Sequence, residues 1–336
     1  IYLRNKCIAI SVFILIHLIF CQSAFAAKAD SGEWSGVIPW PHIAVSAGNL
    51  PDGRVVTWLS TEIDSFPDGP DFTYSSVFDP QTETFITVDS NFHDMFCAGI
   101  SSLENGLIVA TGGNPFDTKV SGFNPNTMQW SPLADMNDPR WYGTNVTMPD
   151  NRIWTTFARG SGNRSELYEP QTNSWARTLN ASMQTLVDEQ NQINARPRLS
   201  NTSALNWWAH LAVTPQGKVF QGGATPTWHI FDPAGGGQNV SLGQPIGAGV
   251  ARSYGNVVTY DAGKVVLLGG FNPGVVPPVS VDNVILVDLN SATPVITYGA
   301  PMNYARAYSN TVTLPNGELL IIGGNQVARE FDDTDS

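Results

Sequence analysis

Two residues, the thiol Cys97 and the phenol Tyr142, have side-chain types and a matched spacing that could do chemistry together. Cys97 lies nine residues before Gly106, and Tyr142 lies nine residues before Asn151. Gly106 and Asn151 each occupy the second position of a predicted tight turn. The matched spacing predicts that Cys97 and Tyr142 lie side by side, at one depth on neighbouring repeats.

Cys97 is the only cysteine that remains if residues 1–26 are removed, because Cys7 and Cys21 lie in that segment. Three interpretations stay open for this thiol: pairing between chains, an inert buried group, or covalent modification. The same nine-residue count defines a column of residues, one in each repeat. A ring of ordinary aromatic packing is the alternative explanation for this column. Its members are Ala44, Cys97, Tyr142, Trp208, Tyr254 and Tyr308.

The elements that position this column are six repeats of a turn followed by an apolar strand. Glycine or asparagine at the second turn position is typical of a tight hairpin that needs positive φ. The strands are rich in β-branched and aromatic residues, and several end in Gly-Gly. The turns are Asp52-Gly53, Asn105-Gly106, Asp150-Asn151, Gln216-Gly217, Ala262-Gly263 and Asn316-Gly317. The strands that follow them are 54–60, 107–113, 152–158, 218–224, 264–270 and 318–324.

A second strand-rich element follows five of these hairpins, at 77–88, 123–133, 167–178, 230–240 and 285–296. Periods near 50 residues with a Gly-Gly strand predict an all-β, kelch-type β-propeller. Six blades are recognisable, and we expect seven in the full propeller. We therefore expect residues 27–336 to form a propeller domain that is incomplete at its C-terminus.

The first 26 residues have the pattern of a secretory signal peptide. Arg4 and Lys6 precede an apolar run over 8–20, and Ala24-Phe25-Ala26 fits a cleavage site. The run is short for a membrane span, so we expect no membrane association after cleavage. Five Asn-x-Ser/Thr sequons suit a secreted glycoprotein: Asn145, Asn163, Asn180, Asn201 and Asn239.

The segments around Cys97 and Tyr142 resemble those of a known family. The string His93-Asp94-Met95-Phe96-Cys97-x-Gly99 resembles the segment with the cross-linking cysteine in galactose oxidase and glyoxal oxidase, the copper radical oxidases. Arg140-Trp141-Tyr142 resembles the segment with their cross-linked tyrosine. The resemblance covers roughly residues 33–336. It implies a Cys97–Tyr142 thioether radical cofactor and copper held in part by Tyr142.

The resemblance transfers other residues only in part. Phe66 and Phe331 align with aromatics that face substrate in galactose oxidase. The tryptophan that stacks on the thioether in that enzyme falls at Gly160 here. The family's second tyrosine and its two histidines have no match, since Tyr308 is followed by Ser309 and aligns with the penultimate blade. The resemblance therefore implies that most copper ligands lie outside this chain, and that the chain alone is inactive.

The resemblance thus implies a secreted oxidase-like protein that oxidises a primary alcohol or aldehyde with O2 to give H2O2. The partners would be a small alcohol, aldehyde or sugar and O2. The alternative is a non-catalytic kelch propeller that binds a glycan or a protein. A net charge of −12 argues against nucleic acid as a partner. The chain has no phosphate-binding loop, no paired CxxC and no HExxH motif.

Overall fold

The computed structural model describes residues 34–67, 69–158, 164–184, 186, 208–225, 227–243, 252–271 and 279–327. The chain divides into two compact units, Ile1–Trp40 and Pro41–Ser336. The predicted signal peptide over 1–26 lies outside the described residues. Among the residues described, no helix is long and apolar enough to cross a membrane.

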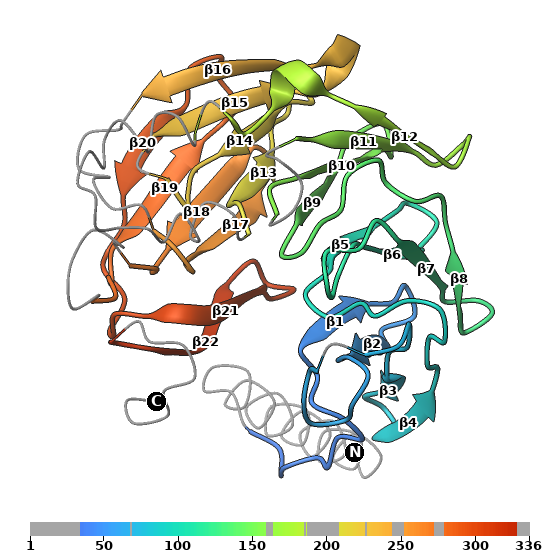
Figure 1. Ribbon diagram of the computed structural model, residues 1–336. Coiled ribbons are helices and arrows are strands. Elements are labelled where there is room, and N and C mark those ends of the chain that lie inside the picture. The colour runs from blue at the N-terminus through green and yellow to red at the C-terminus, as the bar shows by residue number, and fades with distance from the viewer. Residues whose placement is uncertain are drawn as a thin grey trace, which may run out of the picture. The chain divides into compact units, whose positions relative to one another are not determined.

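The second unit is built of antiparallel sheets, as the sequence predicts. Its described residues form five four-stranded sheets and one two-stranded sheet (Figure 1). In chain order, the first three sheets are β1 to β4 (Ser46–Asn49, Val55–Trp58, Ser75–Asp79, Thr84–Thr87), β5 to β8 (Gly99–Ser102, Ile108–Thr111, Val120–Asn124, Gln129–Pro132) and β9 to β12 (Thr144–Thr147, Ile153–Thr156, Glu166–Glu169, Ser174–Arg177). The next are β13 to β16 (Leu211–Val213, Val219–Gln221, Trp228–Asp232, Gln238–Gly243), β17 to β20 (Asn256–Asp261, Lys264–Leu268, Val284–Asp288, Val295–Tyr298), and the pair β21 and β22 (Ala307–Thr313, Leu319–Asn325).

The six predicted tight turns are all present between the first and second strands of the sheets. Their second residues have φ angles between +66° and +88°. Only glycine adopts this conformation without steric cost, and asparagine is the side chain that tolerates it best. The residues are Gly53, Gly106, Asn151, Gly217, Gly263 and Gly317. The turn chemistry inferred from the sequence is therefore confirmed in every repeat.

The first strand of each sheet is the innermost one. From the second sheet on, each first strand contacts the first strand of the next: β5 with β9, β9 with β13, β13 with β17, and β17 with β21. Successive sheets therefore follow one another around a common axis as the blades of a propeller (Figure 1). The second strands β6 and β10 are buried along their whole length, whereas β22 of the last sheet has no buried residue.

The hydrophobic core is divided among the interfaces between adjacent blades. One cluster joins Trp58 of the first blade to Phe123 and Trp130 of the second. Another joins Trp154 of the third blade to Phe231 of the fourth. Trp58 and Trp154 are fully buried, so these large aromatic side chains belong to the core. Each blade is therefore stabilised by its neighbours rather than by a core of its own.

Candidate functional site

The nine-residue column has a common backbone conformation. Five of its six members have φ between +36° and +64°, an uncommon region for residues other than glycine. They are Cys97, Tyr142, Trp208, Tyr254 and Tyr308. Four of them lie two or three residues before the innermost strand of their blade. Tyr308 is the second residue of β21, where it interrupts the register between Ala307 and Ser309. Ala44 lacks this conformation and is exposed, so the equal-phase prediction is wrong for the first blade.

Backbone hydrogen bonds connect the column from one blade to the next. The Tyr142 N–H donates to the Cys97 carbonyl over 3.0 Å, and the Trp208 N–H donates to the Tyr142 carbonyl over 3.2 Å. Farther around the axis, the Tyr308 N–H donates to the Tyr254 carbonyl over 3.0 Å. These bonds join residues of consecutive blades, so the column members lie side by side.

Cys97 and Tyr142 are brought into contact. They pack in one cluster with Leu59, Phe96 and Trp141, and the Tyr142 side chain is hydrogen-bonded to the Cys97 thiol. Cys97 is 8% exposed. Burial raises the pKa of the Cys97 thiol to about 12, although the hydrogen bond from Tyr142 acts in the opposite direction. The thiol is therefore protonated at neutral pH, and it faces a phenol rather than solvent.

Two tryptophans pack against the Tyr142 ring. Trp141 stacks on it with ring centroids 4.5 Å apart and an interplanar angle of 27°. Trp208 meets it edge-on at 4.7 Å and 76°. The resemblance aligns the shielding tryptophan with Gly160, which lies outside the described residues. Neither Trp141 nor Trp208 was predicted to pack on Tyr142. The available signals were the adjacency of Trp141 to Tyr142 and the place of Trp208 in the column.

His93 and Asp94 position the loop that carries Cys97. The His93 ring makes hydrogen bonds at both nitrogens, Nδ1 with Ser121 Oγ at 2.7 Å and Nε2 with the Gly112 carbonyl at 3.0 Å. Burial lowers the pKa of His93 to about 4. Asp94 accepts hydrogen bonds from Ser60 Oγ and from the Phe96 N–H, each at 3.1 Å. Both side chains are therefore structural parts of the cysteine motif.

The Gly112-Gly113 pair lets two loops approach the end of β6. A Cβ at Gly112 would overlap the Arg140 carbonyl, and a Cβ at Gly113 would overlap the Asp94 carbonyl. The Gly113 N–H donates to the Arg140 carbonyl over 2.8 Å. The absence of side chains at these two positions therefore sets the separation between the cysteine loop and the tyrosine loop.

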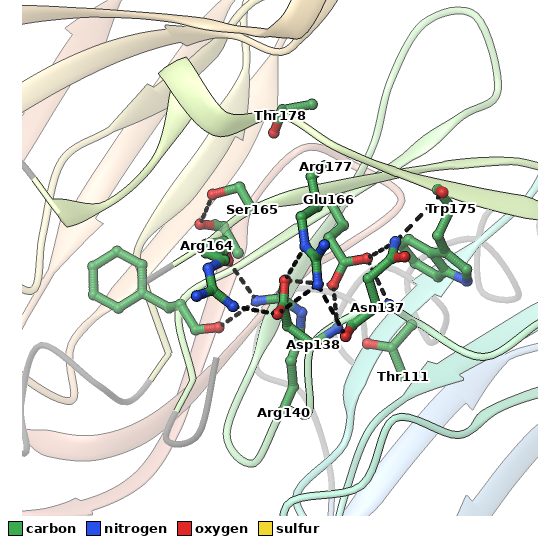
Figure 2. A network of polar contacts seen from close by, with 12 residues as sticks. Thr111, Asn137, Asp138, Arg140, Arg164, Ser165, Glu166, Trp175, Arg177 and Thr178 are labelled. Carbon is green, nitrogen blue, oxygen red and sulfur yellow. Dashed lines mark hydrogen bonds and ion pairs between the residues drawn. The ribbon is translucent and has the colours of Figure 1, made fainter. Parts of the chain in front are cut away.

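A buried polar network holds the segment before Tyr142 (Figure 2). Arg140 has no exposed surface and donates from Nη1 to the carbonyls of Phe157 and Arg164, each over 2.9 Å. Its Nη2 pairs with Glu166 Oε1 at 3.0 Å, and the side chain of Glu166 is equally buried. At the edge of the network, Asp138 pairs with Arg164 at 2.6 Å and with Arg177 at 2.8 Å.

The two aromatics proposed to face substrate have different outcomes. Phe66 is 48% exposed and stacks on Phe96, with centroids 4.7 Å apart and planes 7° from parallel. Phe96 belongs to the cluster that contains Cys97, so Phe66 presents an apolar face close to the cysteine–tyrosine pair. Phe331 lies outside the described residues.

A pocket of about 340 Å³ lies next to the column, and Trp208 is one of its lining residues. Tyr254, Tyr308, Ser253 and His210 are among its lining residues. Within the described part of the chain, His210 Nδ1 and Ser253 Oγ have no hydrogen-bond partner. No group of three or more His, Cys, Asp or Glu side chains that could hold a metal occurs in the same residues. Tyr142 is thus the one copper ligand from the resemblance that the described residues contain.

The fold and the site together define a kelch-type β-propeller in which a buried cysteine contacts a partly buried tyrosine of the next blade. No protein-family model matches the chain. Two galactose oxidase sequences of Gibberella zeae are each 31% identical to it, over 95% of this chain and 48% of theirs. The chain is a homologue of galactose oxidase, and it spans about half the length of these curated relatives.

Solved structures agree with this assignment. A fungal alcohol oxidase of the AA5 family, in complex with copper, superposes with a TM-score of 0.80 and 26% identity. That match covers 90% of this chain and 63% of the oxidase chain. YjhT matches with a TM-score of 0.54 and 14% identity over 87% of this chain, which shows the fold alone.

Proposed function

We propose that the protein is a secreted copper radical oxidase that oxidises a primary alcohol or aldehyde with O2 and releases H2O2. The observation that carries the proposal is the contact between the Cys97 thiol and the Tyr142 side chain. Homology to galactose oxidase and the likeness to a copper-bound alcohol oxidase support the same chemistry.

In this proposal a thioether joins Cys97 to the ring of Tyr142. One S–H bond and one ring C–H bond break, one C–S bond forms, and two protons and two electrons pass to O2 as H2O2. Copper, when bound, supplies the second redox centre of a two-electron oxidation. The Tyr142 oxygen is the ligand from this segment, and we propose that the remaining ligands come from residues outside those described.

The chain's own residues would protect and orient the phenol. Trp141 and Trp208 pack against the Tyr142 ring and reduce its contact with water. Phe66, stacked on Phe96 beside Cys97, provides an apolar surface for the carbon chain of a substrate. Phe331 is proposed as its counterpart on the substrate side.

The test uses protein expressed from the complete reading frame, loaded with copper and assayed for peroxide against primary alcohols, aldehydes and sugars. Tyr142→Phe and Cys97→Ala should each abolish the thioether, seen as loss of a joined peptide two hydrogens lighter than its parts. Tyr168→Phe removes a hydroxyl that bonds Asn173 in the same blade, and it should retain both cross-link and activity. A wild-type protein with free Cys97 and no peroxide in any assay would favour a non-catalytic glycan- or protein-binding propeller.

A further inference from the structure

The buried carboxylate of Glu166 is placed to organise the segment that leads into Tyr142. Its Oε2 accepts from the Asn137 N–H at 2.8 Å and from Asn137 Nδ2 at 2.7 Å. Its Oε1 accepts from the Asp138 N–H and from Arg140 Nη2, each at 3.0 Å. Four hydrogen bonds from residues 137–140 therefore converge on one side chain of β11 (Figure 2).

Arg140 connects that segment to both flanking blades. Its backbone N–H donates to the Asp117 carbonyl of the second blade over 2.9 Å, and its carbonyl accepts from Gly113. Its guanidinium bonds Phe157 and Arg164 of the third blade. Two residues later, the backbone of Tyr142 bonds the carbonyl of Cys97. Glu166 thus acts on Tyr142 through Arg140 and touches neither reacting atom.

The fifth blade contains the same arrangement without the carboxylate. Arg252 precedes Tyr254 as Arg140 precedes Tyr142, and it donates from Nη1 to the carbonyls of Gly269 and Asn283. Ile285 pairs with Leu267 as Glu166 pairs with Thr155. Ile285 therefore occupies the position that corresponds to Glu166.

The fifth blade shows whether a carboxylate at this position is needed for a blade to fold or only for the placement of Tyr142. The fold accepts a fully buried isoleucine at the corresponding position, and Tyr254 still adopts its left-handed conformation, with φ of +55°. Removing one partner of a buried ion pair destabilises a protein by leaving a buried charge uncompensated, yet Arg252 is buried in the fifth blade with an isoleucine at the corresponding position. A carboxylate at this position is thus not needed to build a blade. It occurs in the blade whose column tyrosine contacts the cysteine.

We infer that Glu166, acting through Arg140, is a positioning residue that holds the Tyr142 ring in register with the Cys97 thiol for thioether formation. This inference rests on the proposed function. Bond formation between two side chains depends on their relative placement, and misplacement by about 1 Å can cost a reaction as much as 10²-fold in rate.

The experiment follows cross-link formation in protein expressed from the complete reading frame without copper. Cu(II) and O2 are added, and the fraction of joined Cys97 and Tyr142 peptides is measured over time by mass spectrometry. Glu166→Ile gives the third blade the arrangement of the fifth, and Glu166→Gln keeps the side-chain size. Both should slow cross-linking by at least about tenfold.

The matched control is Glu169→Gln, the same change on the same strand. Glu169 accepts only the Gln171 N–H among the hydrogen bonds described for its side chain, so this variant should cross-link at the wild-type rate. Val265→Ala removes fully buried core volume in the fifth blade and should lower the melting temperature without slowing the reaction. This pair of outcomes distinguishes placement from a general loss of stability.

A Glu166→Ile or Glu166→Gln protein that is folded and cross-links at the wild-type rate would overturn the positioning role and leave the proposed function intact. If either variant fails to fold, the other decides the question. If wild-type protein forms no thioether with copper and O2, the proposed function fails, and this inference fails with it.

Discussion

Mild acid should destabilise the fold through two buried histidines. Burial lowers the pKa of His93 and of His210 to about 4, from an ordinary value of 6.5. Each ring therefore binds its proton more readily in the unfolded chain. The stability that this contributes is complete above pH 6.5, and it is lost as the pH falls towards 4.

The size of the effect follows from the two pKa values. At pH 5 the unfolded histidine is almost fully protonated and the folded one is largely neutral, which costs about 2 kcal/mol for each ring. The charged groups that act on His93 are Asp117 and Asp71, which raise its pKa, and Lys119, which lowers it. Burial, the largest cause, acts in the same direction as Lys119 and outweighs the two aspartates and the hydrogen bond to the Gly112 carbonyl, which also raises the pKa.

The assay is urea unfolding of wild type and His93→Gln, each near pH 7 and near pH 5. The Nε2 of glutamine can still donate to the Gly112 carbonyl that accepts from His93, so much of the local packing should survive. Wild type should lose about 2 kcal/mol more than the variant between the two pH values. Asp138, whose pKa is lowered from 3.8 by its arginine partners against the effect of burial, loses its contribution only in stronger acid.

Equal losses of unfolding free energy in wild type and His93→Gln would refute the reasoning. That result would mean that His93 is protonated in the folded state near pH 5, and that the hydrogen bond with Ser121 adapts to the charge. A matching His210→Gln variant should behave as His93→Gln does if burial is the cause in both.

Three further predictions concern other parts of the chain. Before cross-linking, Cys97 should resist iodoacetamide at neutral pH and react after unfolding in urea, because its raised pKa keeps the thiol protonated; mass spectrometry detects the adduct. In a eukaryotic secretory host, the exposed Asn180 should carry a glycan and the buried Asn145, which accepts from Thr111, should not; site-specific glycopeptide analysis decides this. Trp154→Ala, at a fully buried position, should lower the unfolding free energy by about 3–5 kcal/mol, measured by denaturant titration.

The repeat made the architecture and the main pair predictable from the sequence. Each blade needs one positive-φ turn, so Gly106 and Asn151 mark equal positions and allow their neighbours to be counted. That count placed Cys97 beside Tyr142 without any knowledge of coordinates. It is wrong at Ala44, because the segment entering the first blade does not adopt the conformation that the other five share.

Other features of the site leave no periodic signal. Glu166 lies in a strand whose pattern resembles that of every other blade, and nothing in a single sequence shows that its carboxylate is buried. Trp208 packs on Tyr142 from another blade. The only sequence signal for this contact is that both residues lie nine positions before a turn. Long-range pairing of individual side chains depends on how the blades meet, which the spacing of turns does not determine.

The left-handed column also bears on how new activities could arise in such a protein. Its conformation is common to cysteine, tyrosine and tryptophan, so the surrounding backbone and not the side chain must specify it. At these five column positions the side chain can therefore differ while the backbone keeps a similar left-handed conformation. Exchanging side chains at Trp208 or Tyr254 would alter the lining of the pocket while leaving the scaffold untouched. A library restricted to these two positions would explore reactivity with little risk of misfolding.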